Sequence, residues 1–176
     1  MLSPLLVYIN LRNTDISTRE VLKENKMSMI VVREADPLDT ESIVSLMTTE
    51  NDNLNYPIFE TIDRIAPEIT KIRVEARMAA EDLSVVVATI DSEVVGTGYL
   101  TEEGHISATY VKTPKRGVAK ALLKARIKKA KELGLTHITM AVYKENTKLL
   151  KLAKSLGFVP ASDEEETPVM LIKSLT

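Results

Sequence analysis

Along most of this chain, apolar residues recur either at every second position or at spacings of three and four, which predicts strands and helices respectively. The apolar run 29–32 predicts a first strand. Asp39 or Thr40 can then cap a helix that buries Ile43, Leu46 and Met47. A second helix begins at Pro67, and its predicted apolar face is formed by Ile69, Ile72, Ala76 and Ala79.

The pattern then changes to three strands and a long helix. LSVVVATI (83–90) and VVGTGYL (94–100) flank the turn Asp91-Ser92-Glu93 and predict a hairpin. HISATYV (105–111) is rich in β-branched and aromatic residues and predicts a third strand. From Gly117 we expect a helix that ends at Gly134, with an apolar face formed by Ala119, Leu122, Leu123, Ile127, Ala130 and Leu133.

The C-terminal part adds strand HITMAVY (137–143), a helix from its cap Asn146 to its stop Gly157, and a closing strand TPVMLIKSL (167–175). This order of elements predicts an α/β (α+β) fold, in which helices flank a mixed, twisted sheet. We therefore interpret residues 29–176 as one domain.

The first 28 residues form an N-terminal extension in this interpretation. LLVYINL (5–11) predicts a strand, and Ser17 with Glu20 forms a capping-box pattern that starts a short helix. This segment, 1–28, is either an added strand and helix or the product of an early start codon.

The composition is that of an ordinary folded domain, with 44% hydrophobic and 27% charged residues. Because 23 Lys and Arg stand against 25 Asp and Glu, nothing in the total charge favours wrapping nucleic acid or coating an anionic membrane. The absence of Cys excludes disulfides and thiolate metal sites, and with only two His no metal is expected. MLSPLLVYINL is too short for a membrane span and lacks the features of a signal peptide, so we expect a cytoplasmic protein.

A local cluster of positive charge interrupts this balanced composition. TPKRG (113–117) connects the predicted third strand to the long helix. A helix N-terminus carries about half a positive charge, and Gly permits close approach of the backbone. Phosphate is therefore the natural ligand for Lys115, Arg116, Gly117 and Lys120. The later lysines lie away from the apolar face and are interpreted as a solvated surface: Lys124, Lys128, Lys129 and Lys131.

Three segments resemble the GNAT superfamily of acetyl-coenzyme A dependent N-acetyltransferases. IVVREADPLDTESI (30–43) is similar to the family's first strand and helix, VVVATIDSEVVGTGYL (85–100) to its hairpin, and NTKLLKLAKSLGFVP (146–160) to its Asn-to-Gly-Phe segment. The resemblance covers residues 29–176. It implies a GNAT-like fold, with acetyl-CoA as the acyl donor and a primary amine that attacks it directly in a ternary complex.

The resemblance also implies which residues bind the coenzyme. In this family a Q/R-x-x-G-x-G/A loop binds the pyrophosphate of coenzyme A through backbone amides. Gly117, Val118 and Ala119 match the G-x-A part, whereas Pro114 stands in place of the Gln or Arg, and Lys115 or Arg116 is the substitute charge. Asn146 either only caps its helix or also binds the pantetheine arm. The implied binding residues are Val111, Lys112, Lys115, Arg116, Gly117, Val118, Ala119, Lys120 and Asn146.

A general base is sought near the third strand. His105 opens this strand, where some relatives carry a catalytic Glu, and its ordinary pKa of about 6.5 suits proton acceptance. Glu102 and Glu103 are alternatives. Backbone N–H groups around Tyr110 and Val111 are implied as donors to the oxyanion.

A general acid is also sought for the leaving thiol. Many relatives have a Tyr at the position that Ala153 occupies here. The candidate acids in this chain are therefore Tyr143 and Tyr110, with protonation from water as the alternative.

The acceptor is suggested only by acidity. Carboxylates occur on the side where relatives bind their acceptor, which favours a cationic small-molecule amine or the Lys or N-terminal amine of a peptide: Glu50, Asp52, Glu60, Asp63 and 163–166. Apolar segments 5–11 and 167–175 could pair at a sheet edge, which predicts a homodimer.

Two other functions compete with an active enzyme. Pro114 and Ala153 favour a regulatory module that binds acyl-CoA but has lost efficient catalysis. A nucleic-acid-binding role for the Lys-rich helix fits less well, because the chain is also acidic and offers no neighbouring aromatic residues for stacking.

Overall fold

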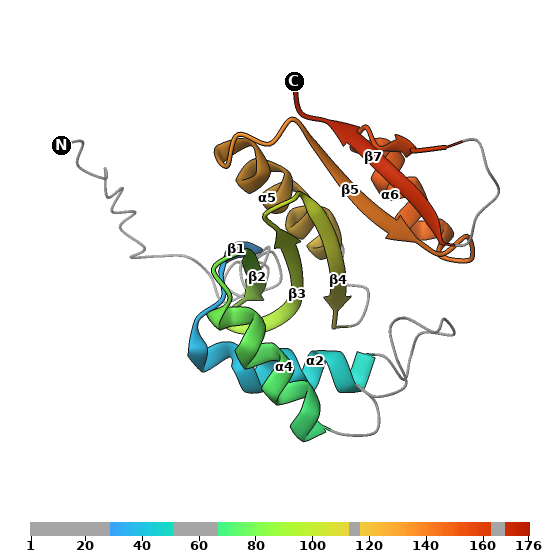
Figure 1. Cartoon of the computed structure of the whole chain (residues 1–176). Coiled ribbons are helices and arrows are strands. Elements are labelled where there is room, and N and C mark those ends of the chain that lie inside the picture. The colour runs from blue at the N-terminus through green and yellow to red at the C-terminus, as the bar shows by residue number, and fades with distance from the viewer. Residues whose placement is uncertain (1–28, 51–66, 113–116, 163–167) are drawn as a thin grey trace, which may run out of the picture.

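A computed structural model describes residues 29–50, 67–112, 117–162 and 168–176. In this part of the chain a seven-stranded sheet has the order β1-β2-β3-β4-β5-β7-β6 (Figure 1). Its strands are β1 (Val31–Glu34), β2 (Leu83–Ile90), β3 (Glu93–Thr101), β4 (His105–Val111), β5 (His137–Val142), β6 (Val159–Pro160) and β7 (Val169–Ser174). Only β4 and β5 run parallel; the other neighbours are antiparallel. The predicted α/β fold with a mixed sheet is confirmed.

Helices cover both faces of the sheet (Figure 1). They are the 3-10 helix η1 (Pro37–Asp39) and the α-helices α2 (Thr40–Glu50), α4 (Pro67–Ala79), α5 (Val118–Glu132) and α6 (Thr147–Ser155). Successive residues of β2 face opposite layers, as the strand period of two requires. Val85 and Val87 pack with Ile43 and Met47 of α2, whereas Val86 and Ala88 pack with Val118 and Leu122 of α5.

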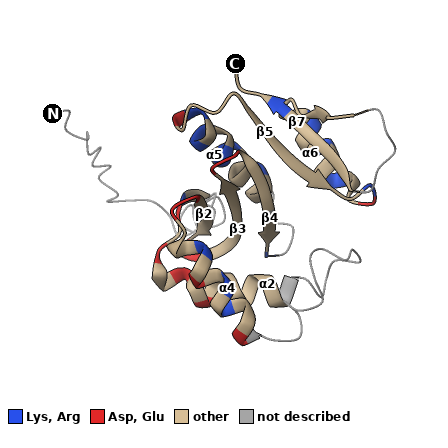
Figure 2. Cartoon of the chain, viewed as in Figure 1, with Lys and Arg blue, Asp and Glu red and all other residues tan. Residues whose placement is uncertain are grey.

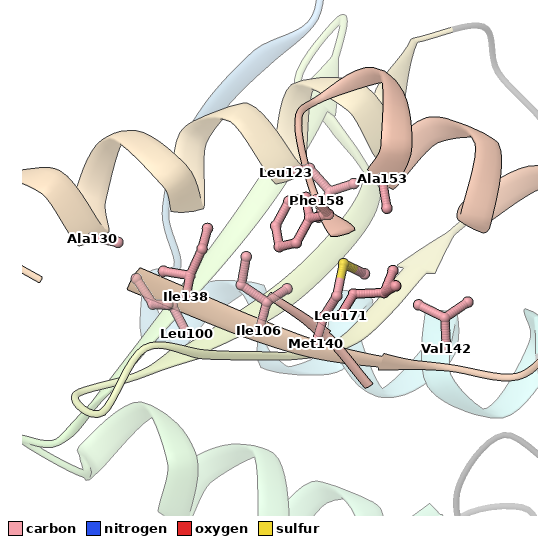
Figure 3. Close-up of a cluster of buried hydrophobic side chains, with 10 residues drawn as sticks. All are labelled: Leu100, Ile106, Leu123, Ala130, Ile138, Met140, Val142, Ala153, Phe158 and Leu171. Atoms are coloured by element: carbon pink, nitrogen blue, oxygen red, sulfur yellow. The ribbon is translucent and has the colours of Figure 1, made fainter. Parts of the chain in front are cut away.

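A separate hydrophobic cluster joins β4, β5 and β7 to α5 and α6 (Figure 3). Ile106 and Met140 come from adjacent strands, and Leu123 of α5 and Phe158, which follows α6, pack against this cluster from the helical side. All four side chains are at most 3% exposed. This packing holds β4 and β5 together at the end where His105 begins β4.

The hairpin and most strand boundaries agree with the sequence pattern. β2 and β4 occupy the predicted residues, and the turn between β2 and β3 has positive φ at Asp91 (49°) and Ser92 (68°), as a type I′ turn requires. The first strand begins at Val31 instead of residue 29, and β5 ends at Val142, one residue earlier than expected. The N-terminal extension, 1–28, lies outside the described residues.

The predicted apolar face of α4 is wrong. Ile69 is 45% and Ile72 is 64% exposed, and Ala76 and Ala79 are exposed as well. The helix instead buries Thr70 and Val74, one turn apart, because that side meets α2 and β2. Spacing alone could not distinguish the two faces, since both carry residues at helical intervals.

The cap of α2 also differs from the prediction. Asp36 caps η1 through Leu38 N, and the Asp39 carboxylate reaches back to accept a hydrogen bond from Asp36 N at 2.7 Å. Asp39 also receives two hydrogen bonds from Arg33, at 2.6 and 2.9 Å, which lower the pKa of its carboxyl group. Thr40 donates its hydroxyl to Pro37 O. Neither Asp39 nor Thr40 therefore caps α2, because both are used by the preceding turn.

The apolar face of α5 includes a charge that the pattern did not predict. Leu122, Leu123 and Ala130 are fully buried as expected, but Leu133 is 50% exposed and forms the C-cap. Arg126, by contrast, is 0% exposed and belongs to the buried face of the helix. None of the described helices is both long and apolar enough to cross a membrane.

Candidate active site

The strands β4 and β5 separate along their length (Figure 1). They pair only at His105 with Thr139 and at Ile106 with Met140, although β4 continues to Val111 and β5 to Val142. We call the unpaired parts beyond Ile106 and Met140 the β4–β5 fork. β4 and β5 are thus parallel neighbours that splay apart. Ligands of open α/β sheets bind at such carboxyl ends of strands.

A bulge in β4 lies within this fork. Thr97 pairs with Tyr110 and Tyr99 pairs with Ser107, so two residues of β4 stand opposite the single residue Gly98 of β3. A bulge of this kind bends its strand and leaves backbone groups without their usual ladder partners. The bend occurs where β4 leaves β5.

A cavity of about 220 Å³ opens beside the fork. Its walls come from β4, the start of α5 and the start of α6: Thr109, Val111, Ala119, Asn146, Lys148, Leu149 and Leu152. The Asn146 side chain accepts a hydrogen bond from Leu149 N at 3.1 Å and so caps α6, as predicted. The cavity is mostly apolar, with a few polar groups and a helix N-terminus at each of two sides, which is typical of a small-molecule site.

The start of α5 provides backbone donors next to this cavity. Gly117 precedes the helix with φ +94°, and no side-chain cap is present in the described part of the chain. The first intrahelical bond runs from Ala121 N to Gly117 O, so the amides of Val118, Ala119 and Lys120 have no intrahelical acceptor. A methyl group on Gly96 of β3 would lie 2.8 Å from Val118, so this glycine lets the helix start approach the sheet. The helix start can therefore receive an anion.

The helices on either side of the cavity are basic (Figure 2). The sequences of α5 and α6 contain Lys at many outward positions and Glu132 as the single acidic residue. An anionic ligand would thus meet a favourable field at this side of the sheet.

Only some of the predicted coenzyme-binding residues lie at this cavity. Val111, Ala119 and Asn146 line the cavity, and Gly117 and the exposed Lys120 lie at the helix start beside it. The side chain of Val118 is fully buried, which leaves only its backbone for a ligand. Lys112 forms an ion pair with Glu93 at 2.5 Å and lines a different cavity. Lys115 and Arg116 lie outside the described residues.

The predicted catalytic residues are not brought together. His105 lies at the paired end of β4, about 20 Å along the strand from Val111 at 3.3 Å per residue. Its Nδ1 lies 3.0 Å from Thr139 Oγ1, and partial burial lowers its pKa. Tyr110 is 2% exposed and packs in the cluster of α2, α4 and β2. Tyr143 follows β5 at the open end of the fork, and its carbonyl accepts a hydrogen bond from Asn146 N at 2.9 Å.

The alternative candidate bases, Glu102 and Glu103, do not line the cavity beside the fork either. Glu102 lines a separate cavity of about 290 Å³ near the start of β2. Glu103 has a pKa lowered by hydrogen bonds from its own backbone and from Thr101. Ala153, at the position where relatives carry Tyr, is fully buried in the cluster of Figure 3.

The proposed acceptor region cannot be assembled from the described residues. Asp52, Glu60, Asp63 and 163–166 lie outside them, and Glu50 is the last residue of α2. Two described carboxylates, Glu41 and Glu93, line a cavity of about 300 Å³ between α2 and the ends of β3 and β4. No group of three His, Asp or Glu residues within the described ranges could hold a metal ion.

Sequence reasoning missed Arg126 and Thr109. Arg126 Nη2 donates to Thr109 Oγ1 at 2.8 Å, and Thr109 lines the cavity beside the fork. The available signal was an Arg inside an otherwise apolar helical face, together with Gly98 in the middle of a strand. Gly in a strand interior often marks the close approach of another group.

Comparison with known proteins identifies the family of this architecture. The model of the Acetyltransferase (GNAT) family matches residues 48–158. This range contains the fork, the start of α5 and the cap of α6, which are the parts that form the cavity.

Solved structures share the fold at low sequence identity. PaiA N-acetyltransferase from Thermoplasma acidophilum, in complex with coenzyme A, is 17% identical with a TM-score of 0.69, and the match covers 83% of this chain and 99% of that one. The structure of yncA from Salmonella typhimurium with acetyl-CoA is 18% identical with a TM-score of 0.66, and the match covers 85% of this chain and 95% of that one. An N-acetyltransferase from Staphylococcus aureus Mu50 is 17% identical with a TM-score of 0.69, and the match covers 85% of this chain and 100% of that one.

Proposed function

Because this chain belongs to the acetyltransferase (GNAT) family, we propose that it transfers an acetyl group from acetyl-CoA to a primary amine by direct attack in a ternary complex. The observation that carries this proposal is the β4–β5 fork, which opens beside a helix start whose backbone amides have no side-chain cap in the described part of the chain. A donor that carries phosphates at one end and an apolar arm at the other matches these two features.

The acyl donor is oriented by the order of the cavity walls. Its pyrophosphate lies against the amides of Val118 and Ala119, where Gly117 permits close approach. The pantetheine arm passes between Val111 and Asn146, and the thioester reaches the bulge of β4 near Thr109. Lys115, Arg116 and Lys120 add charge at the phosphate end. Two solved relatives of this fold contain coenzyme A or acetyl-CoA, which supports the same donor here.

The reaction requires a neutral amine and stabilisation of a developing anion. An amine with a pKa near 10.4 needs roughly 4 to 5 kcal/mol for deprotonation at pH 7. Backbone N–H groups of β4 near Tyr110 and Val111 are the proposed oxyanion donors, since they belong to the strand that bends away from β5. Preorganised donors of this kind need no movement during the reaction.

The positions of the three candidate catalytic side chains support their proposed roles to different degrees. Tyr143 is the favoured acid for the leaving thiol because it follows β5 at the open end of the fork. His105 would have to act from the paired end, and Tyr110 from within a buried cluster. Water is the alternative proton source for the leaving thiol, in place of Tyr143 or Tyr110.

The acceptor is proposed to be a cationic amine, either a small molecule or the amine of a peptide. The carboxylates of Glu50, Asp52, Glu60, Asp63 and 163–166 support this choice. Glu41 and Glu93 line a cavity at the α2 side of the sheet, but they pair with Lys71 and Lys112 and so add little net negative charge there. Function in the cytoplasm as a homodimer remains part of the proposal. β7 is flanked on its outer side by the two-residue β6, so a partner strand would pair next to or in place of β6.

Calorimetric titration with acetyl-CoA, followed by thiol release in a panel of amines, tests the proposal. We expect binding of acetyl-CoA and amine-dependent release of coenzyme A with at least one class of polyamine, aminoglycoside-like compound or Lys-bearing peptide. Absence of binding would refute the donor. Binding without turnover in any amine would favour the regulatory module that binds acyl-CoA without efficient catalysis.

A further inference from the structure

The guanidinium of Arg126 is buried beneath the β4–β5 fork without a charged partner. Its side chain is 0% exposed, and within the described ranges no carboxylate lies at ion-pair distance from it. Its hydrogen bonds go to neutral oxygens: Leu122 O, Tyr99 O, Ser107 O and Thr109 Oγ1. Burial lowers its pKa to about 9, so the group still carries its charge at neutral pH. A buried charge of this kind is costly and calls for an anion nearby.

Neighbouring backbone is shaped around this guanidinium. A methyl group on Gly98 would lie 2.6 Å from Nη1 and 2.7 Å from Cζ, so a larger residue would displace the guanidinium from this position. The bulge in β4 lies opposite this same glycine, and Arg126 bonds to Ser107 O before the bulge and to the Thr109 hydroxyl within it. Arg126 therefore fixes the shape of β4 where that strand leaves β5.

Thr109 connects this buried charge to the cavity. Its Oγ1 accepts from Arg126 Nη2 at 2.8 Å, and the residue also lines the cavity with Val111 and Asn146. A hydroxyl that accepts one hydrogen bond can still donate its own proton, and no described protein group accepts it. Because Thr109 is partly exposed and lines the cavity, a group bound in the cavity can accept this proton. Along the chain, Thr109 lies in the bulge before the end of β4, whereas Ala119 lies in the first turn of α5 at the proposed phosphate end, so Thr109 is the wall residue placed toward the expected thioester.

We propose that Thr109 donates a hydrogen bond to the sulfur of the acyl-CoA thioester as that sulfur becomes a thiolate, and that Arg126 is a positioning residue that orients and polarises this hydroxyl. The inference rests on the proposed acetyl transfer. In the reaction the amine nitrogen bonds to the thioester carbon, the C–S bond breaks, and sulfur leaves with the electron pair. The neutral amine nitrogen becomes positively charged when it forms this bond, and it then loses a proton to solvent. Thr109 and Arg126 retain their protons, so they stabilise the leaving group without being consumed.

Substitutions at Thr109 test this role directly. In Thr109→Val we expect kcat for thiol release to fall about 10- to 100-fold, the scale of losing one hydrogen bond to a charged group, with the Kd for acetyl-CoA within about threefold of wild type. Thr109→Ser should restore kcat to within about threefold because it keeps the hydroxyl. Thr97→Val is the matched control, since Thr97 Oγ1 donates to Val86 O within the sheet and does not line the cavity. It should leave kcat unchanged.

Arg126 is tested through its dependence on Thr109. Arg126→Met should lower kcat on its own but add no further loss in the Thr109→Val background, whereas Arg126→Lys should recover part of the activity. A purely structural role predicts losses that multiply and that follow thermal stability. The folded fraction is checked by circular dichroism, and the Thr109→Val and Thr109→Ser pair decides the proposal even if Arg126→Met does not fold.

The outcomes separate this inference from the proposed function. If wild type does not bind acetyl-CoA, or binds it without releasing thiol to any amine or to water, both fail. If wild type is active and Thr109→Val matches it, or if Thr109→Ser is as impaired as Thr109→Val, only the thiolate donor fails. Multiplicative losses in the double variant would refute the positioning role of Arg126.

Discussion

The two ends of β4 differ in how they use their polar groups. At the first end, His105 pairs with Thr139 of β5, its ring contacts the Thr139 hydroxyl at 3.0 Å, and Ile106 belongs to the buried cluster of α5, α6 and β7. At the second end, β4 leaves β5, a bulge interrupts its ladder, and the cavity lies beside Val111. The closed end is paired and packed, whereas the open end borders a cavity that a ligand can enter.

This difference shows that residue type is a weaker guide to chemistry than position in the sheet. His105 is the side chain best suited to proton transfer at neutral pH, yet it lies at the closed end. Gly117 and Thr109 have little intrinsic reactivity, yet they lie beside the opening. The predictions below test this contrast, beginning with the largest effect.

Closing the helix start should have the largest effect. We expect Gly117→Val to weaken acetyl-CoA binding by about 3 kcal/mol, or more than 100-fold, because charge-assisted bonds to the first-turn amides are lost. A β-branched residue at φ +94° is also strained. Gly134→Val is the matched control, since Gly134 follows the other end of α5 with φ +76° and open space around it. Calorimetry should find normal affinity in Gly134→Val; equal losses in both variants would show that only helix strain was measured.

Removing charge before the helix should have the next largest effect. Lys115→Ala with Arg116→Ala should weaken acetyl-CoA binding by about 1 to 3 kcal/mol, and the loss should shrink for a pantetheine fragment without the pyrophosphate. Lys128→Ala with Lys129→Ala should change affinity little, because these lysines pair with Glu132 and Glu34 on the surface. Equal losses in both double variants would indicate a general electrostatic surface and a polyanionic partner.

A change at Asn146 separates capping from ligand binding. Asn146→Asp should keep the cap of α6, because Asp accepts the hydrogen bond from Leu149 N equally well, so thermal stability should stay nearly constant. The new negative charge and the lost amide donor should weaken acetyl-CoA binding by about 1 kcal/mol. Unchanged affinity in titration calorimetry would mean that Asn146 serves only its helix.

The smallest effect on turnover is expected at the closed end. His105→Gln should keep kcat within about twofold at pH 8, because the ring lies away from the cavity. A drop of more than tenfold, with loss of one limb of the pH–rate profile, would instead identify His105 as the base.

Stability should depend on pH through the same histidine. Burial lowers the pKa of folded His105 below its unfolded value of about 6.5, so on acidification the unfolded chain binds the proton first. Its contribution to stability is therefore complete above that unfolded pKa and is lost as pH falls from it toward the folded pKa. Denaturant melts between pH 8 and pH 5 should show less acid destabilisation in His105→Gln than in wild type.

Local sequence determined most elements of this protein. The apolar run in 83–90 and the β-branched and aromatic residues of 105–111 predicted β2 and β4, because such residues favour a buried strand. Turns and caps also follow from the preferences of single residues. Positive φ occurs at Asp91 and Ser92 of the hairpin and at Gly117 and Gly157 beside helices, and the Asn146 side chain caps α6. The resemblance to the GNAT family indicated the order in which these elements assemble.

Only the tertiary structure decided which residues share a site. Ile69 and Ile72 have the spacing of a buried face but point outward, and Arg126 has the charge of a surface residue but lies under the sheet, because helix orientation depends on the layers above and below. Thr109 and Asn146 are distant in sequence but line the same cavity. His105 and Val111 are close in sequence but lie at opposite ends of β4. The point at which β4 separates from β5 depends on the pairing of these two strands and on the bulge between β3 and β4. No single segment of the sequence encodes this point.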